Sequence, residues 1–349
     1  MAKRKTLPKD FEELLKAGDL DALKAVFEKC DVNAYGGHAK ETALAFDACP
    51  DELARWLVAH GADVNATDTW RNTPLHSRAR SWLTSIDVLL ELGANVHAEA
   101  SIGTPLHATA HSQHAEHAKQ LLAFGADIHA KNRQGMTALE LALSICSNAQ
   151  LERMPAYVRV LLEAGAERTD AMKRSVRERG EQFELHRAGF AKEGVAAASA
   201  GLDYLYQTFG VTPVPRREMH DGKRPIGVES KTWQKQHQEL WKLLVPSRGP
   251  AETVQGEVIR ISGRIGDEWY RNGGANWDRD YLAMANALAK YFQTGEPLSP
   301  SEIDEVKSTV RGLAERQGEG NDRLAELAVT WVLKNRDPIK LEKPTSYAR

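Results

Sequence analysis

The sequence has little of what marks disulfide-rich, zinc-binding or membrane-spanning proteins. Its three cysteines, Cys30, Cys49 and Cys146, are odd in number, widely spaced and without a Cys-x-x-Cys pair. They favour reduced, buried side chains over a disulfide framework, a zinc knot or a catalytic thiol. No run approaches the roughly 20 consecutive apolar residues of a membrane span, and the amino terminus has no apolar core before a small-residue cleavage site. We therefore expect a cytoplasmic protein that does not bind a membrane.

An excess of charge of one sign is also absent. Lys and Arg number 46 and Asp and Glu 48, which leaves a net charge of −2, and 42% of the residues are apolar. This composition is typical of a soluble globular protein, and it lacks the overall basic field that nucleic-acid binding favours. We expect the short basic start, residues 1–6, to be a solvated tail.

Motifs that carry catalysis are missing as well. The sequence has no phosphate-binding G-x-x-x-x-G-K, no dinucleotide-binding G-x-G-x-x-G, no G-x-S-x-G and no H-E-x-x-H. We predict no catalytic residue, no cofactor and no metal. The exception to examine is the segment TPLHATAHSQHAEH, residues 104–117, whose four histidines are spaced closely enough to suggest a metal site.

Two short motifs recur in phase through the first half of the chain. Turns of the type GADVNA return every 32 residues, at Asp31, Asp63, Asn95 and Asp127. Thr-Pro-Leu or Thr-Ala-Leu recurs at a similar interval, at residues 42, 73, 104 and 137. These residues suit a pair of helices, because threonine caps a helix, proline at the first helical position needs no amide partner, and glycine ends a helix in the left-handed conformation.

This pattern resembles the ankyrin repeat, which has a period of about 33 residues and the signature T-P-L-H-x-A. The resemblance covers about residues 7–170 and implies four to five helix pairs that stack into a solenoid, because one pair cannot bury its apolar face alone. The first and last units depart from the pattern as caps do. The second repeat has Thr42-Ala43-Leu44-Ala45 in place of T-P-L-H. We predict an all-α fold: an ankyrin solenoid, residues 7–170, followed by a helical domain.

The repeat also explains most of the histidines. His76 and His107 fall in T-P-L-H, where the resemblance implies a structural histidine that ties adjacent repeats. His114 falls where the family's G-H-x-E pattern carries histidine between the two helices. His111 and His117 stay unexplained, and they lie six residues apart on different predicted helices. We therefore favour repeat chemistry over a metal site.

The resemblance further implies where a partner protein binds, because ankyrin arrays use the turn fingers before T-P-L and the exposed side of the first helix. The finger positions here are Trp70, Arg71, Ser101, Ile102 and Gln134. The helix positions are Arg80, Ser81, His111 and Ser112. Trp70 is the strongest candidate, since tryptophan dominates binding hot spots; alternatively it folds back on a neighbouring finger or fills space against the second domain. Trp82, beside a one-residue deletion, could plug a gap between helices.

Residues 171–349 follow a different helical pattern, with a loop near 210–229. Apolar residues recur at steps of three and four, as at Val195, Ala198, Leu202, Leu205 and Phe209. The segments LWKLLVP, TVQGE and RNGGANWD are similar to a small helical module of uncharacterised bacterial proteins, which favours a bacterial source.

One helix of this half carries a charged stripe at steps of three and four. Its members are Glu257, Arg260, Arg264, Glu268 and Arg271. We expect a solvated face, because exposed charge pairs on a helix are common and contribute little. Two alternatives are a polar clamp buried against Asn272, Asn276 and Asp278, and a surface that faces a charged partner.

The sequence thus predicts recognition of another protein without catalysis. Its most specific version is a bacterial immunity or regulatory protein that covers a partner's active site. The first alternative is a secreted effector or enzyme with targeting repeats, which would need a pocket that gathers the arginine stripe or His186, His220, Asp221 and His237. The second alternative is that the helical half is purely a structural cap.

Overall fold

The computed structural model describes residues 2–315, 320–342, 345 and 347. The chain divides into two compact units. The first comprises Met1–Phe183 and Ala191–Val214, and the second comprises Glu184–Phe190 and Pro215–Arg349. Each unit is described by itself.

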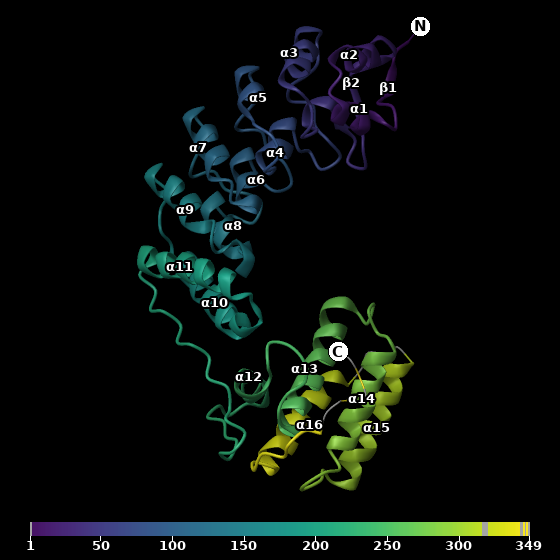
Figure 1. The fold of residues 1–349 in the computed structure, drawn as a ribbon, viewed down its shortest axis with the longest axis vertical. Helices are drawn as coiled ribbons and strands as arrows, with labels where there is room; N and C mark the ends of the chain where they lie inside the picture. Colours follow the sequence, from purple (N-terminus) through teal and green to yellow (C-terminus); the bar gives the residue numbers. More distant parts are fainter. Residues whose placement is uncertain (1, 316–319, 343–344, 346, 348–349) are drawn as a thin grey trace. The chain divides into compact units, whose positions relative to one another are not determined.

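The first unit is an array of helix pairs in two rows (Figure 1). It begins with α1 (Phe11–Ala17) and α2 (Leu20–Lys29). The inner row continues with η1 (Ala43–Ala45), α4 (Pro74–Ala79), α6 (Pro105–Ser112) and α8 (Ala138–Ile145). The outer row continues with α3 (Asp51–Ala59), α5 (Asp87–Glu91), α7 (Ala115–Ala123) and α9 (Met154–Glu163). The inner members pack successively on one another, and in the outer row α3 packs on α5 and α7 on α9. Gln120 of α7 donates to Asp87 of α5, so the predicted solenoid is confirmed.

The T-P-L-H signature builds the start of the inner helices. Thr73 and Thr104 each precede a proline in the first turn and form a capping box with the histidine three residues later. Leu75 and Leu106 then point into the core and are 0% and 1% exposed. Local sequence therefore fixes where each inner helix begins, and the buried leucine fixes which face it turns to its neighbours.

The same histidines connect each repeat to the next. His76 Nε2 lies 3.1 Å from the backbone oxygen of Gly103, and His107 Nε2 lies 3.0 Å from that of Met136. In both residues the other ring nitrogen, Nδ1, faces the backbone N–H of the capping threonine, so Nε2 carries the proton and donates across the repeat boundary. The predicted structural role of both histidines is confirmed.

Residues 4–6 of the basic amino terminus form a strand and not a solvated tail, which corrects the expectation for this part of the segment. Strand β1 (Arg4–Thr6) pairs in parallel with β2 (Cys30–Gly36), and β2 pairs with β3 (Glu41–Thr42) in antiparallel register. The side chains of β1 stay exposed. Its backbone groups are satisfied by β2, and Leu7, which follows the strand, is buried and donates its amide to Tyr35.

The array does not end at residue 170. Helices α10 (Asp170–His186) and α11 (Lys192–Phe209) follow, and the first unit extends to Phe183 and takes in α11. Helix α11 packs on α9 and on η2 (Asn148–Gln150). The contact is close because Gly201 has no side chain: a Cβ there would lie 2.0 Å from the Leu151 carbonyl oxygen. The compact units therefore divide elsewhere than the predicted boundary, since α11 buries its apolar face on the array.

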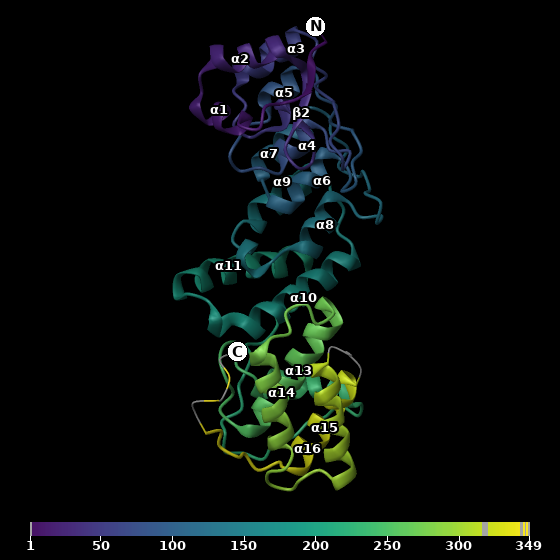
Figure 2. The same cartoon turned by 90° about the vertical axis from the view of Figure 1, so that its right-hand side faces the viewer.

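The second unit is a helical bundle (Figure 2). After the short η3 (Arg187–Gly189) and a long connection, its helices are α12 (Trp233–Leu244), α13 (Val254–Asn272), α14 (Arg279–Tyr291), α15 (Pro300–Ala314) and α16 (Asn321–Lys334). Helix α13 packs against α12, α14 and α16, and α15 packs against α14 and α16. On the apolar side of α13, Val258, Ile261 and Ile265 are each 0% exposed. The helical character predicted for this half is confirmed.

We predict that Gly103→Ala destabilises the array more than Gly125→Ala does. Both glycines have left-handed φ, +113° and +85°, so alanine strains either backbone by about 1–2 kcal/mol. Only at Gly103 would the new Cβ also lie 2.7 Å from the His107 ring, which adds about 1–3 kcal/mol of overpacking. Urea unfolding of both variants measures the difference; equal losses would mean that the His107 contact does not constrain this turn.

Candidate protein-binding surface

The finger tips of the array are held by hydrogen bonds both within and between repeats. Asp68 Oδ1 accepts the backbone amides of Trp70 and Asn72, at 2.8 and 2.7 Å. The Trp70 carbonyl oxygen in turn accepts the Ser101 hydroxyl of the next finger at 3.0 Å. Adjacent fingers are therefore tied together, and side chains at their tips are carried on a rigid edge.

Trp70 projects from this edge. Its side chain is 57% exposed, and within the described residues no aromatic or cationic side chain packs on its ring. Arg71, the next residue, is also exposed and has a φ of 67°, in the left-handed region. An arginine in this conformation is strained where glycine is not, and such strain is retained most often at functional positions.

The other predicted finger and helix residues differ in exposure. Ser101 and Gln134 are exposed at the tips, and Ile102 is half-buried. Arg80 is exposed at the end of α4. Burial, and in second place the charge of Arg80, lowers the pKa of His111. Two positions serve local structure, since Ser81 accepts the amide of Leu83 and Ser112 donates to the backbone of Thr109.

A stacked cluster at the loop after α4 was not among the predicted site residues. Trp82 stacks on His114 with ring centroids 4.1 Å apart, and His114 stacks on His117 at 3.6 Å. The Arg153 guanidinium lies 4.9 Å from the Trp82 ring centroid, and the Trp82 indole donates to the backbone of Ser112 at 3.2 Å. Trp82 thus bridges repeats, as the one-residue deletion suggested. It is also 50% exposed and precedes Leu83, which is 84% exposed.

Comparison with known proteins agrees with this geometry. Residues 103–133 match the ankyrin repeat family. The array is built of ankyrin repeats. The chain is 34% identical over 145 residues to human Rabankyrin-5, a match that covers 35% of this chain and 12% of the relative. It is 39% identical over 99 residues to ankyrin repeat and SOCS box protein 5 of Mus musculus, covering 28% of this chain and 29% of the relative.

A third relative shows the same limited coverage. BCL-6 corepressor-like protein 1 of Homo sapiens is 39% identical over 115 residues, which cover 32% of this chain and 6% of the relative. The chain therefore matches less than a third of the length of these relatives. The ankyrin repeats support a role as a scaffold for protein–protein interaction, in which the partner is another protein. No described helix is long and apolar enough to cross a membrane.

Three of the four histidines of the 104–117 segment, His107, His114 and His117, serve the ankyrin repeats. His114 caps α7 by accepting the His117 amide on Nδ1, and His117 Nδ1 lies 3.2 Å from the Ala79 carbonyl oxygen. Burial, together with the neighbouring His117, lowers the pKa of His114 to about 4. Among the described residues, no group of three or more His, Cys, Asp or Glu side chains is placed to hold a metal ion.

In the second unit the charged stripe is not a solvated face, which corrects that expectation. Glu257, Arg260 and Glu268 are 0%, 1% and 3% exposed. Glu257 accepts two hydrogen bonds from Arg260, at 2.9 and 2.5 Å, one from the Ala251 amide and one from the Tyr347 hydroxyl. A buried carboxylate and guanidinium are stable together because each satisfies the other.

The polar-clamp alternative is confirmed at one residue of the stripe, Glu268. Glu268 accepts the Asn272 amide at 3.0 Å and the backbone and side-chain amides of Asn276 at 2.7 and 3.2 Å. Asp278 caps α14. Arg271 alone behaves as expected of a solvated stripe, since it is exposed and pairs with Asp267.

Two residues of the enzyme alternative, Asp221 and His237, serve local structure. Asp221 accepts the amides of Lys223 and Arg224 and pairs with the Arg224 side chain, which makes the His-Asp-Gly segment a turn. His237 lies against the Ser262 hydroxyl at 3.0 Å, and burial lowers its pKa to about 4. Neither Asp221 nor His237 lines a nearby cavity that contains His186.

That cavity, of about 110 Å³, brings His186 together with Arg217, Arg260 and Arg264. Arg217 is held there by the carbonyl oxygens at the end of α12, including that of Trp241 at 2.9 Å. A cation at this helix terminus is stabilised by the helix dipole, so the position has a structural explanation.

We predict that Glu257→Gln destabilises the second unit by about 3–5 kcal/mol, because it leaves the buried Arg260 charge without its carboxylate. Arg271→Gln on the same helix removes an exposed pair and should change stability by less than about 1 kcal/mol. Chemical denaturation followed by near-ultraviolet circular dichroism measures both. A small loss for Glu257→Gln would contradict a buried ion pair.

We predict that the ankyrin array loses stability as the pH falls from about 6.5 to 4. The pKa of His114 is about 4 in the folded protein against an ordinary 6.5, and the pKa of His76 is also lowered to about 4 by burial. The unfolded chain therefore binds more protons in this window, and protonation favours unfolding. His114→Asn keeps a capping side chain but removes one titrating ring, so its melting temperature should fall less over this pH range. If the melting temperatures of the wild type and of His114→Asn fall by the same amount over this pH range, His114 does not contribute to the loss of stability.

Proposed function

We propose that the ankyrin array binds a partner protein through its finger tips and the exposed ends of its inner helices. The observation that carries this proposal is Trp70, whose large apolar side chain is 57% exposed on a finger fixed by hydrogen bonds. A rigid, exposed tryptophan gives a large contact area with little loss of side-chain entropy on binding. Arg71, beside it, adds a planar donor for carboxylates or backbone oxygens.

The binding surface extends beyond Trp70 in this proposal. It includes Arg71, Ser101, Ile102 and Gln134 on the fingers and Arg80, Ser81, His111 and Ser112 along the inner helices. Trp82, 50% exposed, joins the same set.

The consequence of binding that we propose is inhibition of the partner. A surface that presents the apolar side chain of Trp70 and the guanidinium groups of Arg71 and Arg80 can cover the active site of a partner. We therefore propose a regulatory or immunity protein, in the cytoplasm of a bacterium. The similarity of the second half to a bacterial helical module supports this source, whereas the relatives of the array are eukaryotic.

The test is to capture the partner from the native cell with the full chain, identify it by mass spectrometry and measure its affinity for variants. We expect Trp70→Ala to weaken binding by about 30-fold, the loss typical of a hot spot. Phe124→Ala is the matched control, since Phe124 is 53% exposed at the end of the outer helix α7. Unchanged affinity of Trp70→Ala would refute the finger surface.

Arg71→Gly separates binding from folding. Glycine relieves the left-handed backbone, so the array should keep or gain stability, by up to about 1 kcal/mol. Loss of the Arg71 side chain should nevertheless weaken partner binding. A variant that melts at or above the wild-type temperature yet binds less tightly would place Arg71 in the interface; unchanged affinity would remove it.

A further inference from the structure

Two adjacent fingers of the array carry a basic residue in the left-handed backbone conformation. Lys40 and Arg71 have φ of 58° and 67°, and each lies two residues before the threonine that begins the inner helix of its repeat. Gly135 holds the same position before Thr137, with a φ of 77°. Glycine adopts this conformation without strain and a long side chain does not, so both cations are retained against the preference of the backbone. A role for their side chains accounts for this.

Hydrogen bonds between the fingers hold these two cations on one edge. The amide and the hydroxyl of Thr69 both donate to the Ala39 carbonyl oxygen of the preceding finger, at 2.9 and 3.0 Å. Lys40 follows Ala39, and Arg71 lies two residues after Thr69. The backbone positions of Lys40 and Arg71 are therefore fixed relative to each other, with Trp70 beside them on the second finger.

The exposed charges at the finger tips are mostly positive. The tips comprise residues 37–40, 67–72, 99–102 and 131–135, and their exposed charged side chains are Lys40, Arg71, Glu99, Lys131 and Arg133. Among the described residues, no ion pair within 4.0 Å includes any of these five. An acidic segment would meet four cations and one carboxylate here, whereas a basic segment would meet mainly repulsion.

A further carboxylate at the tips, that of Asp68, is occupied by the finger itself. Its Oδ1 accepts the backbone amides of Trp70 and Asn72, and its Oδ2 accepts the side-chain amide of Asn72 at 3.0 Å. Asp68 is half-buried, so it shapes the turn from within while Trp70 and Arg71 project from it.

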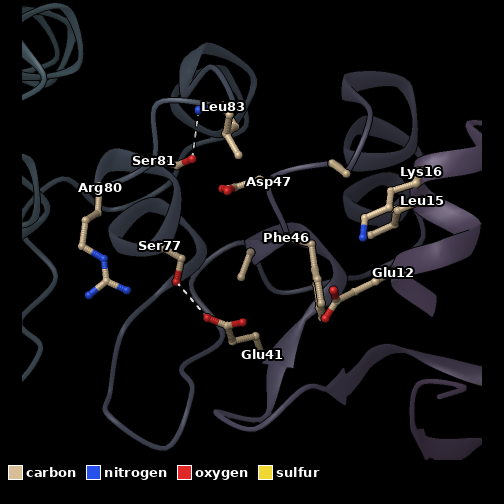
Figure 3. Close-up of a pocket in the computed structure, with 12 residues that line it drawn as sticks. Glu12, Leu15, Lys16, Glu41, Phe46, Asp47, Ser77, Arg80, Ser81 and Leu83 are labelled. Carbon is tan, nitrogen blue, oxygen red and sulfur yellow. Dashed lines mark hydrogen bonds between the residues drawn. The ribbon is translucent and has the colours of Figure 1, made fainter. Parts of the chain in front are cut away.

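Glu41, the residue after Lys40, is half-buried in the lining of a groove of about 490 Å³ beside η1. Figure 3 shows it directed to Ser77, whose hydroxyl donates to it at 3.3 Å. Lys16 and Arg80 line the same groove, so the groove does not favour an occupant of either charge. The finger tips, in contrast, have an excess of exposed cations.

We propose that the finger tips bind an acidic segment of the partner protein, with carboxylates that pair with Lys40 and Arg71 and an apolar side chain that packs on Trp70. The planar guanidinium of Arg71 can donate two parallel hydrogen bonds to one carboxylate. This inference rests on the proposed function and adds the chemistry of the partner. A protein segment fits better than nucleic acid, because the chain has a net charge of −2 and no overall basic field.

The first step of the test is a selection of peptides from a random heptapeptide display library on the full chain. We expect enrichment of sequences with several Asp or Glu residues and a Leu, Phe or Trp. The most enriched peptide is then synthesised with a fluorescent label, and its affinity is measured by anisotropy for the wild type and for Lys40→Gly/Arg71→Gly. The double variant should bind about tenfold more weakly, because two exposed charge pairs are lost.

The double variant also separates binding from folding. Glycine relieves the left-handed backbone at both positions, so the variant should melt no lower than the wild type. Lys119→Gln is the control, since Lys119 is exposed on the outer helix α7, and it should bind the peptide as the wild type does. Replacing the acidic residues of the peptide by their amides should remove binding to the wild type, and added salt should weaken it.

The inference is overturned if no acidic sequence is enriched, or if the double variant binds the selected peptide as tightly as the wild type. It is also overturned if a labelled single-stranded oligonucleotide binds more tightly than the peptide and loses binding in the double variant, because the tips would then recognise phosphates. Each of these results leaves the proposed function standing when Trp70→Ala still weakens capture of the cellular partner. If Trp70→Ala leaves capture unchanged while the peptide still requires Lys40 and Arg71, the proposed function fails and the acidic-peptide site is retained.

Discussion

The hydrogen bond from each repeat histidine to the backbone of the following repeat is the constraint on which the array depends. His76 reaches Gly103 and His107 reaches Met136, each from a ring that is almost fully buried. Because both ring nitrogens are engaged, the side chain fixes the start of its own helix and the position of the next finger together. The fingers that carry Trp70 and Ser101 are therefore held in register by contacts inside the array, and their tips are free for a partner.

The places where this chain departs from a regular ankyrin repeat are the places where its surface becomes distinctive. Arg71 occupies a left-handed position that glycine would adopt without strain. The shortened helix of the second repeat opens the groove at Glu41, and the loop with one residue fewer carries Trp82 and Leu83. A sequence tolerates such local conflicts where function requires them and where neighbouring repeats supply the missing stability.

The second unit depends on a buried polar network as well as on apolar packing. Its longest helix, α13, is apolar on one side and buries Glu257, Arg260 and Glu268 as well. These groups satisfy one another and their neighbours across long distances in the sequence: Tyr347, which donates to Glu257, is 90 residues away. A network of this kind specifies how the helices are arranged more than it adds to their stability, because desolvation offsets much of the attraction between the charges.

The sequence by itself determined the repeat, the starts of the inner helices, the role of His76 and His107 and the helical character of the second half. Each of these depends on capping, periodicity and turn chemistry within a few residues or on recurrence at one interval. Only the tertiary structure decided that the amino terminus forms a strand, that the stripe of α13 is buried, that Trp82 stacks between repeats and that a groove opens beside Glu41. A helical spacing of charges is the same whether that face meets water or another helix, so burial depends on distant segments that no local pattern contains.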